Sequence, residues 1–222
     1  MLDYKKYKHF SFDVWLTLIK SHPEFKLERA KLLKDFFEIE AQIEDVFSVL
    51  KYYDNTCNDI NEVTGGNIDT FEIYLLILSK FNKRPSIEDL EKFYNNAEQL
   101  FFNYPPILLD HFTKDDFDRI KNQGSGINIL SNTGFIQGNT MRKHFDHIGL
   151  LDYFDFEIFS DEVNISKPNP KIFALLEQQL ESKIDRNLIV HIGDNYKSDY
   201  LGAINYGYDA YLIKNEKNLQ PT

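Results

Sequence analysis

Short apolar runs that end in polar residues recur along this chain. Three of them, HFSFD, GINILSNTG and NLIVHIGDN, end at Asp13, at Ser131 and Asn132, and at Asp194 and Asn195. Two shorter runs, YFDFEIFSDE and YDAYLIK, have the same apolar character. Runs of this length between polar segments are typical of buried strands. The pattern therefore predicts several strands, three of which carry polar groups directly after their apolar part.

Helical patterns separate these strands from about residue 107 onward. Apolar residues recur at helical spacing over 113–124 and 169–183, and a short helix over 198–207 ends at Gly207. Alternating strands and helices predict an α/β fold, a Rossmann-like parallel sheet with helices on both faces. Ligands bind beyond the carboxyl ends of the strands in such sheets, which is where the polar residues lie.

Residues 21–104 have a different pattern. They contain long helical repeats over 24–40, 41–57, 69–82 and 86–104, with no strand-like alternation. We therefore predict an all-helical cap at 21–104, inserted into a core formed by 1–20 and 105–222. The chain leaves the first strand at its carboxyl end, so the cap is expected over that edge of the sheet.

Composition restricts the possible partners. The 222 residues carry a formal net charge of −10, which argues against binding a nucleic acid backbone. A small anion stays compatible, because charges are screened over about 8 Å and one local lysine can dominate a site. No apolar run approaches the ~20 residues of a membrane span. The single cysteine, Cys57, excludes an intrachain disulfide and favours a cytoplasmic location, whereas nothing indicates the oligomeric state.

Four segments, in order, resemble the motifs of the haloacid dehalogenase-like hydrolase superfamily with an inserted helical cap. They are FDVWLTL at the end of the first strand, ILSNTG, SKPNPKIF and HIGDNYKSDYLGA. The resemblance spans residues 10 to about 213, and the helical insert matches by type and position only. Each motif alone is weak evidence, whereas all four in order, after the expected kinds of element, are specific.

The resemblance implies a role for each matching residue. Asp13 is expected to be the nucleophile, because a carboxylate can form a covalent intermediate that divides one displacement into two. Thr17 is expected to orient the turn after it. Ser131 and the backbone amides near Asn132 would hold phosphoryl oxygens, and Lys167 would neutralise charge on the nucleophile and the transferring group.

The resemblance also implies a Mg²⁺ site. Its ligands would be the carboxylates of Asp13 and Asp194 and the backbone carbonyl of Trp15, a set of hard oxygen donors that suits this ion. Asp199 would hold a metal-bound water or the lysine, and Asn195 would contact the metal ligands without binding the ion itself.

Trp15 is the main departure from the family pattern. Phosphatases of this superfamily usually have a second aspartate there, which protonates the leaving group and later activates water. General acid–base catalysis is worth about 10²–10⁴ in rate, and an indole cannot supply it. We therefore expect weak activity, a substrate with a good leaving group, or a proton donor from the cap. Leu16, where the family usually has glycine, further crowds the turn.

Three functions stay open. The first is Mg²⁺-dependent hydrolysis of a small phosphorylated metabolite through an aspartyl intermediate at Asp13. The second is binding of a phosphate or metabolite with little turnover, which Trp15 favours. The third is metal-free hydrolysis of a carbon–halogen bond, because dehalogenases of this superfamily have an aromatic residue at the position of Trp15. Three converging carboxylates repel one another without a cation, which favours the metal-dependent enzyme. His191, inside an apolar strand, is predicted to be a core histidine.

Overall fold

A computed structural model describes residues 2–213 of the chain and has a five-stranded parallel sheet at its centre. The strand order is β5-β4-β1-β6-β7. The strands are β1 (His9–Phe12), β4 (Gly126–Ser131), β5 (Phe156–Phe159), β6 (Ile189–Gly193) and β7 (Asp209–Leu212). This order and the parallel pairing confirm the predicted α/β fold. In the register, Phe12 of β1 lies beside Ile129 of β4 and Ile192 of β6, so the three central strands end at the same edge.

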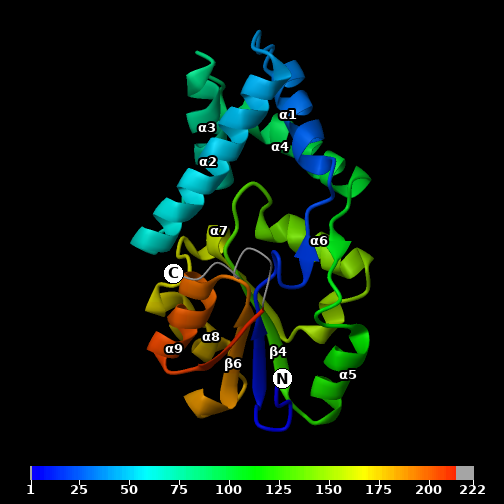
Figure 1. Cartoon of the computed structure of the whole chain (residues 1–222), viewed down its shortest axis with the longest axis vertical. Coiled ribbons are helices and arrows are strands. Elements are labelled where there is room, and N and C mark those ends of the chain that lie inside the picture. The colour runs from blue at the N-terminus through cyan, green and yellow to red at the C-terminus, as the bar shows by residue number, and fades with distance from the viewer. Residues whose placement is uncertain (1, 214–222) are drawn as a thin grey trace.

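Helices cover both faces of the sheet, as predicted (Figure 1). One face carries α5 (Lys114–Asn122) and α6 (Gly138–His147), whose apolar side chains share a buried cluster with Phe10 and Phe12 of β1. The other face carries α8 (Pro170–Gln179) and α9 (Gly202–Tyr206), which belong to a second cluster. Burial on both faces explains why β1 has no exposed residue.

The shorter elements connect these layers. They are α7 (Ser160–Val163), the 3₁₀ turns η1 (Leu151–Tyr153) and η2 (Arg186–Leu188), and the π-helical segment η3 (Tyr196–Leu201) directly before α9. The sequence pattern over 198–207 predicted one short helix there, and the structure divides it between η3 and α9. The sequence pattern did not predict helix α6. Among residues 2–213, none of the helices combines the length and the hydropathy that a membrane span needs.

Four helices leave the sheet between two short paired strands, β2 (Ile19–Lys20) and β3 (Ile107–Leu108). They are α1 (Phe25–Phe36), α2 (Ile43–Thr64), α3 (Thr70–Lys80) and α4 (Ile87–Asn103). Capping boxes at Asp69 and Ser86 satisfy the first amides of α3 and α4. Helix α2 extends beyond the predicted end at residue 57 and stops at Gly65, whose φ of 69° favours glycine.

These helices have a hydrophobic core of their own, separate from the two clusters on the sheet. It includes Leu33 of α1, Leu50 of α2, Ile77 of α3 and Phe93 of α4, each at most 2% exposed. Cys57 is buried in the same cluster as a free thiol. Figure 1 shows the four helices gathered at one end of the sheet.

Polar contacts join the helical layer to the sheet on two sides. On the α6 side, the Tyr94 and Thr140 hydroxyls lie 2.9 Å apart, and Thr140 donates to Glu98. On the α8 side, the carbonyl of Gly65 accepts hydrogen bonds from the backbone of Ser166 and the side chain of Asn169. The space between the two layers is therefore bounded on both sides.

Candidate active site

Asp13 follows β1 directly and is 7% exposed. Its backbone N–H donates to the carbonyl of Ile192 (2.8 Å), so the β1–β6 pairing continues one residue beyond β1 and fixes the start of the turn. The chain then turns back within a few residues, and Leu16 adopts a φ of 59° while its N–H donates to Ile19 (2.7 Å). A left-handed conformation costs a leucine about 1–2 kcal/mol.

The ammonium group of Lys167 lies between two buried carboxylates. Its Nζ is 3.0 Å from Oδ1 of Asp13 and 2.7 Å from Oδ1 of Asp199, and the lysine is 1% exposed. The same nitrogen donates to the backbone carbonyl of Leu130 (2.5 Å) at the end of β4. Lys167 therefore joins three segments that are far apart in the sequence.

Burial and charge together set the protonation states of this group. Burial alone would lower the pKa of Lys167, but Asp13 and Asp199 outweigh it and raise that pKa. Burial also opposes ionisation of Asp199, yet the nearby Lys167 and the hydrogen bond with His191 hold the pKa of its carboxyl well below its usual range. Burial raises the pKa of Asp13 to about 6 against the attraction of Lys167, and repulsion from Asp199 adds to the rise. Asp13 is therefore the carboxylate of this cluster that gains a proton first as the pH falls.

The side chain of Asn132 holds the backbone of Lys167. Its Nδ2 donates to the carbonyl of Lys167 (2.9 Å), and its Oδ1 accepts from the N–H of that residue (2.8 Å). Ser131 donates its hydroxyl to Oδ1 of Asp13 (3.1 Å). The last residue of β4 therefore contacts the aspartate, and the residue after β4 orients the lysine.

His191 is fully buried in β6, as predicted for a core histidine, and it also contacts the charged group. Its Nδ1 lies 3.0 Å from the Ser11 hydroxyl, and its Nε2 lies 3.3 Å from both Lys167 Nζ and Asp199 Oδ1. Burial and, to a lesser extent, the charge of Lys167 together lower the pKa of His191 to about 4, against the opposing effect of Asp199. A neutral imidazole therefore lies beneath the lysine.

The loop after β6 brings the last acidic residues to the same place. Asn195 begins η3, and its backbone N–H donates to Oδ2 of Asp199 (2.9 Å). A side chain on Gly193 would meet the Asp199 carboxylate at 2.2 Å, so this close approach requires glycine. The Asn195 amide also donates to Glu62 of α2 (3.0 Å), which ties the loop to the helical layer.

Carboxylate oxygens of Asp13, Asp194 and Asp199 all lie within 4.8 Å of one another. Such a cluster fits a hard divalent cation that takes oxygen ligands. Both oxygens of Asp199 already contact donors, one Lys167 and the other the Asn195 amide. Donors therefore already hold both oxygens of the Asp199 carboxylate.

A cavity of about 810 Å³ lies between the sheet and the helical layer. Most of the predicted site residues line it: Asp13, Trp15, Asn132, Lys167, Asp194, Asn195 and Asp199. Ser131 and Thr17 are fully buried outside its wall. The Thr17 hydroxyl has no hydrogen-bond partner in the described part of the chain, and only the backbone N–H of Thr17, which donates to Val14, contributes to the turn. The predicted role of the Thr17 hydroxyl stays a prediction.

The cavity wall also contains residues that the sequence did not single out. Arg29 of α1 and Phe135 of the loop after β4 both line the cavity. Asp54 of α2 lines it as well, whereas the ring of His22 packs on Tyr104. No local pattern marks Arg29, because its position depends on how α1 packs against the sheet.

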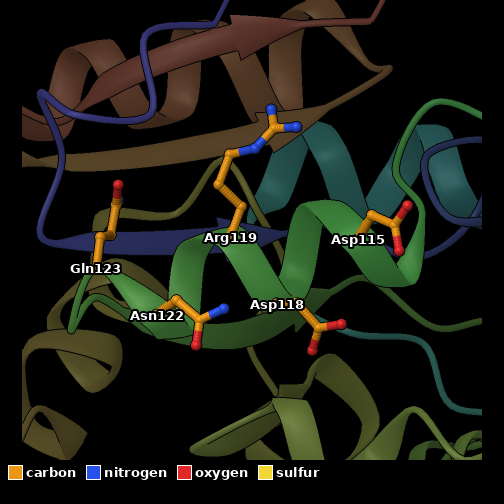
Figure 2. Close-up of a pocket in the computed structure, with 5 residues that line it drawn as sticks. All are labelled: Asp115, Asp118, Arg119, Asn122 and Gln123. Carbon is orange, nitrogen blue, oxygen red and sulfur yellow. The ribbon is translucent and has the colours of Figure 1, made fainter.

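A second hollow, of about 520 Å³, lies on α5. Figure 2 shows the five side chains that line it: Asp115, Asp118, Arg119, Asn122 and Gln123. They point to different sides of one helix and do not converge on a common point. This hollow therefore has no arrangement suited to catalysis.

The fold and the acidic site agree with the comparison to known families. The model of the haloacid dehalogenase-like hydrolases matches residues 7–207. The chain therefore belongs to the haloacid dehalogenase-like hydrolases, as the four motifs predicted.

Relatives of known name include phosphatases. The pyrimidine 5′-nucleotidase YjjG of Escherichia coli is 37% identical over 95 residues, which are 43% of this chain and 40% of that protein. A glyceraldehyde 3-phosphate phosphatase of Methanothermobacter thermautotrophicus is 31% identical over 99 residues, 44% of this chain and 41% of that protein. The chain thus matches about two fifths of the length of these two relatives.

Solved structures share the fold over most of the chain. A phosphatase of this family from Thermococcus onnurineus has a TM-score of 0.69 at 21% identity and covers 94% of this chain and 87% of its own. The hydrolase YfnB of Bacillus subtilis, whose structure was solved bound to magnesium, has a TM-score of 0.70 at 19% identity, with coverages of 97% and 92%. At these identities the likeness shows the fold.

The raised pKa of Asp13 predicts a pH dependence that moves with the Mg²⁺ concentration. If Asp13 is the nucleophile and a metal ligand, as the motifs predict, its protonation with a pKa of about 6 in the ion-free protein should remove both functions as the pH falls. The proton and the cation compete for this carboxylate, so more Mg²⁺ should move the acidic limb of kcat/KM to lower pH. Rate profiles between pH 4.5 and 8 at several Mg²⁺ concentrations measure this; a limb that stays at one pH would contradict it.

Proposed function

We propose that this protein is a Mg²⁺-dependent phosphatase that hydrolyses a small phosphorylated metabolite through an aspartyl-phosphate at Asp13. The observation that carries this proposal is the position of Lys167, whose buried ammonium group contacts the Asp13 carboxylate (3.0 Å) at the wall of a large cavity. A positive charge there lets an anionic nucleophile approach an anionic phosphate. The same charge stabilises the transition state of phosphoryl transfer.

The reaction has two displacements. In the first, an oxygen of the Asp13 carboxylate attacks phosphorus, the bond to the leaving oxygen breaks, and the phosphoryl group becomes attached to Asp13. In the second, water attacks the same phosphorus and releases inorganic phosphate and the free carboxylate. Lys167 stays beside Asp13 in both steps, and Asn132 keeps the lysine backbone in place.

Asp13, Asp194 and the backbone carbonyl of Trp15 are the residues that we assign to Mg²⁺. When bound, the cation would neutralise charge on the phosphoryl oxygens and on the acidic cluster. Without it, Lys167 is the cation that the described contacts place against Asp13 and Asp199. The three carboxylates of Asp13, Asp194 and Asp199 lie close together and repel one another unless a further cation is bound. This charge balance supports the metal-dependent reaction over metal-free dehalogenation.

Trp15 limits which leaving groups the site can release. It is half-buried, lines the cavity and has only an N–H donor. A leaving group that departs as a stable anion, such as an aryl or acyl phosphate provides, needs no proton. We therefore propose that such esters are the preferred substrates. Asp54, Asp59 and Glu62 of α2 also line the cavity and are the carboxyl groups that the helical layer contributes to its wall.

Replacement of Asp13 by asparagine tests the nucleophile. We expect the wild type to hydrolyse p-nitrophenyl phosphate with Mg²⁺ and to lose this activity in a chelator. We expect Asp13→Asn to lower kcat by about 10³-fold or more, because an amide cannot form the intermediate. Asp115→Asn, the same change on α5 outside the cavity, is the control and should leave kcat unchanged. Equal activity in Asp13→Asn, with thermal unfolding showing an intact fold, would refute the nucleophile assignment.

Restoration of the missing acid tests the role of Trp15. We expect Trp15→Asp to raise kcat/KM for an alkyl phosphate by about tenfold or more, because a poor leaving group benefits from a proton donor. The same variant should change p-nitrophenyl phosphate hydrolysis much less. Asparagine has nearly the same shape as aspartate but cannot donate a proton as an acid, so Trp15→Asn should not restore turnover of the alkyl phosphate.

The two variants also separate an enzyme from a binding protein. If Trp15→Asp and Trp15→Asn behave alike on both esters, the leaving-group account is wrong. Binding of phosphorylated metabolites by the wild type without turnover of any ester, even in Trp15→Asp, would favour the binding protein.

A further inference from the structure

Arg29 is a buried cation without an anionic partner. It lies on α1, is 5% exposed and forms part of the cavity wall. Its Nε is fully buried and has no hydrogen-bond partner. Within residues 2–213, no contact of this guanidinium with an acidic side chain or a carbonyl oxygen meets hydrogen-bond or ion-pair distance. Burial of a charge without compensation is strongly unfavourable, and within the described residues no acidic side chain or carbonyl oxygen compensates this one.

Two aromatic rings hold the guanidinium in place. Its central carbon is 3.8 Å from the ring centre of Phe135 and 5.5 Å from that of Phe25. Such contacts use the flat face of the guanidinium and its charge. They leave the N–H donors at the edge without acceptors. The rings therefore fix the orientation of Arg29 but do not satisfy its hydrogen bonds.

Two other cations that line the cavity differ from Arg29 in this respect. Lys167 contacts Asp13 and Asp199, and Lys26, also on α1, lies 3.8 Å from Asp54. Lys26 keeps about half of its side chain in solvent as well. Arg29 has no acidic partner at ion-pair distance among the described residues and is only 5% exposed.

We propose that Arg29 binds a second anionic group of the substrate, at the end away from the phosphate that Asp13 attacks. This inference rests on the proposed phosphatase function and specifies its substrate class: a phosphomonoester that also carries a carboxylate or a second phosphate. The planar guanidinium donates two parallel hydrogen bonds to either group. Arg29 and Asp13 line the same cavity, so a molecule long enough to span it reaches both.

A structural role for Arg29 makes a different prediction. If the arginine only joins Phe25 of α1 to Phe135 of the loop after β4, its removal should lower the melting temperature and affect all ligands equally. If Arg29 instead binds an anion of the substrate, its replacement removes an uncompensated buried charge from the free protein. The melting temperature of the free protein should then stay unchanged or rise, and only ligands with a second anion should bind less tightly.

Non-hydrolysable phosphonates test this proposal without turnover. The probes are propylphosphonate, 3-phosphonopropionate and propane-1,3-bisphosphonate, titrated calorimetrically in the presence of Mg²⁺. We expect the wild type to bind at least one of the two doubly anionic probes about tenfold to a hundredfold more tightly than propylphosphonate, the range expected for hydrogen bonds to a charged group. Probes that are one or two methylenes shorter or longer then locate the spacing of the two anion sites.

Two variants show whether Arg29 is responsible for the preference for doubly anionic probes. Arg29→Met keeps the length and packing of the side chain and should reduce the preference to less than about threefold. Lys31→Met removes the same charge from an exposed position of α1 that does not line the cavity, and should keep the preference. A preference for the carboxylate probe or for the bisphosphonate supports the proposal and identifies the second anion.

The outcomes separate this inference from the proposed function. Equal affinity of the wild type for all three probes, or a preference that survives Arg29→Met, overturns the assignment of Arg29. So does a drop in melting temperature with equal losses for all probes. None of these results affects the hydrolysis assays, and loss of the nucleophile assignment in those assays would leave the binding result standing.

Discussion

The site depends on one buried ammonium group shared by two carboxylates. Lys167 comes from the loop before α8, Asp13 follows β1 and Asp199 lies in η3, so this contact fixes three segments in one place. Removal of one member of such a buried group leaves an uncompensated charge, which typically costs about 3–5 kcal/mol. Hydrogen bonds from Asn132 fix the backbone of Lys167, and the neutral His191 contacts its ammonium group. These contacts hold the positive charge of Lys167 beside Asp13.

The same arrangement explains the local sequence around each residue. Gly193 allows the Asp199 carboxylate to approach the end of β6, and the β1–β6 pairing continues to Asp13. The helical layer then closes the space above this edge and contributes its own charged wall. The charged residues at the edge of the sheet therefore form one wall of the cavity, and residues of α1 and α2 form the opposite wall. Chemistry and selectivity are divided between the two layers in this account.

Much of this could be predicted from the sequence, because strand ends are local features. Apolar runs ending at Asp13, Ser131 and Asp194 predicted the parallel sheet and its functional edge, and the four motifs predicted the family. Residues whose position depends on packing between layers were not predictable in this way. Arg29 lies in an ordinary amphipathic helix, and only the structure brings it to the cavity. The contact of His191 with Lys167 also has no local signal, because it requires the β1–β6 register and the loop before α8 together.

The central claim is that Asp13 accepts a phosphoryl group beside a divalent cation and Lys167. Its most direct test is a crystal structure of the protein with Mg²⁺ and beryllium fluoride, which mimics a phosphoryl group on a carboxylate. The account predicts beryllium bonded to an oxygen of Asp13, a cation between Asp13 and Asp194, and Lys167 in contact with a fluorine. Beryllium fluoride bound elsewhere, or a cation site that excludes Asp13, would contradict it.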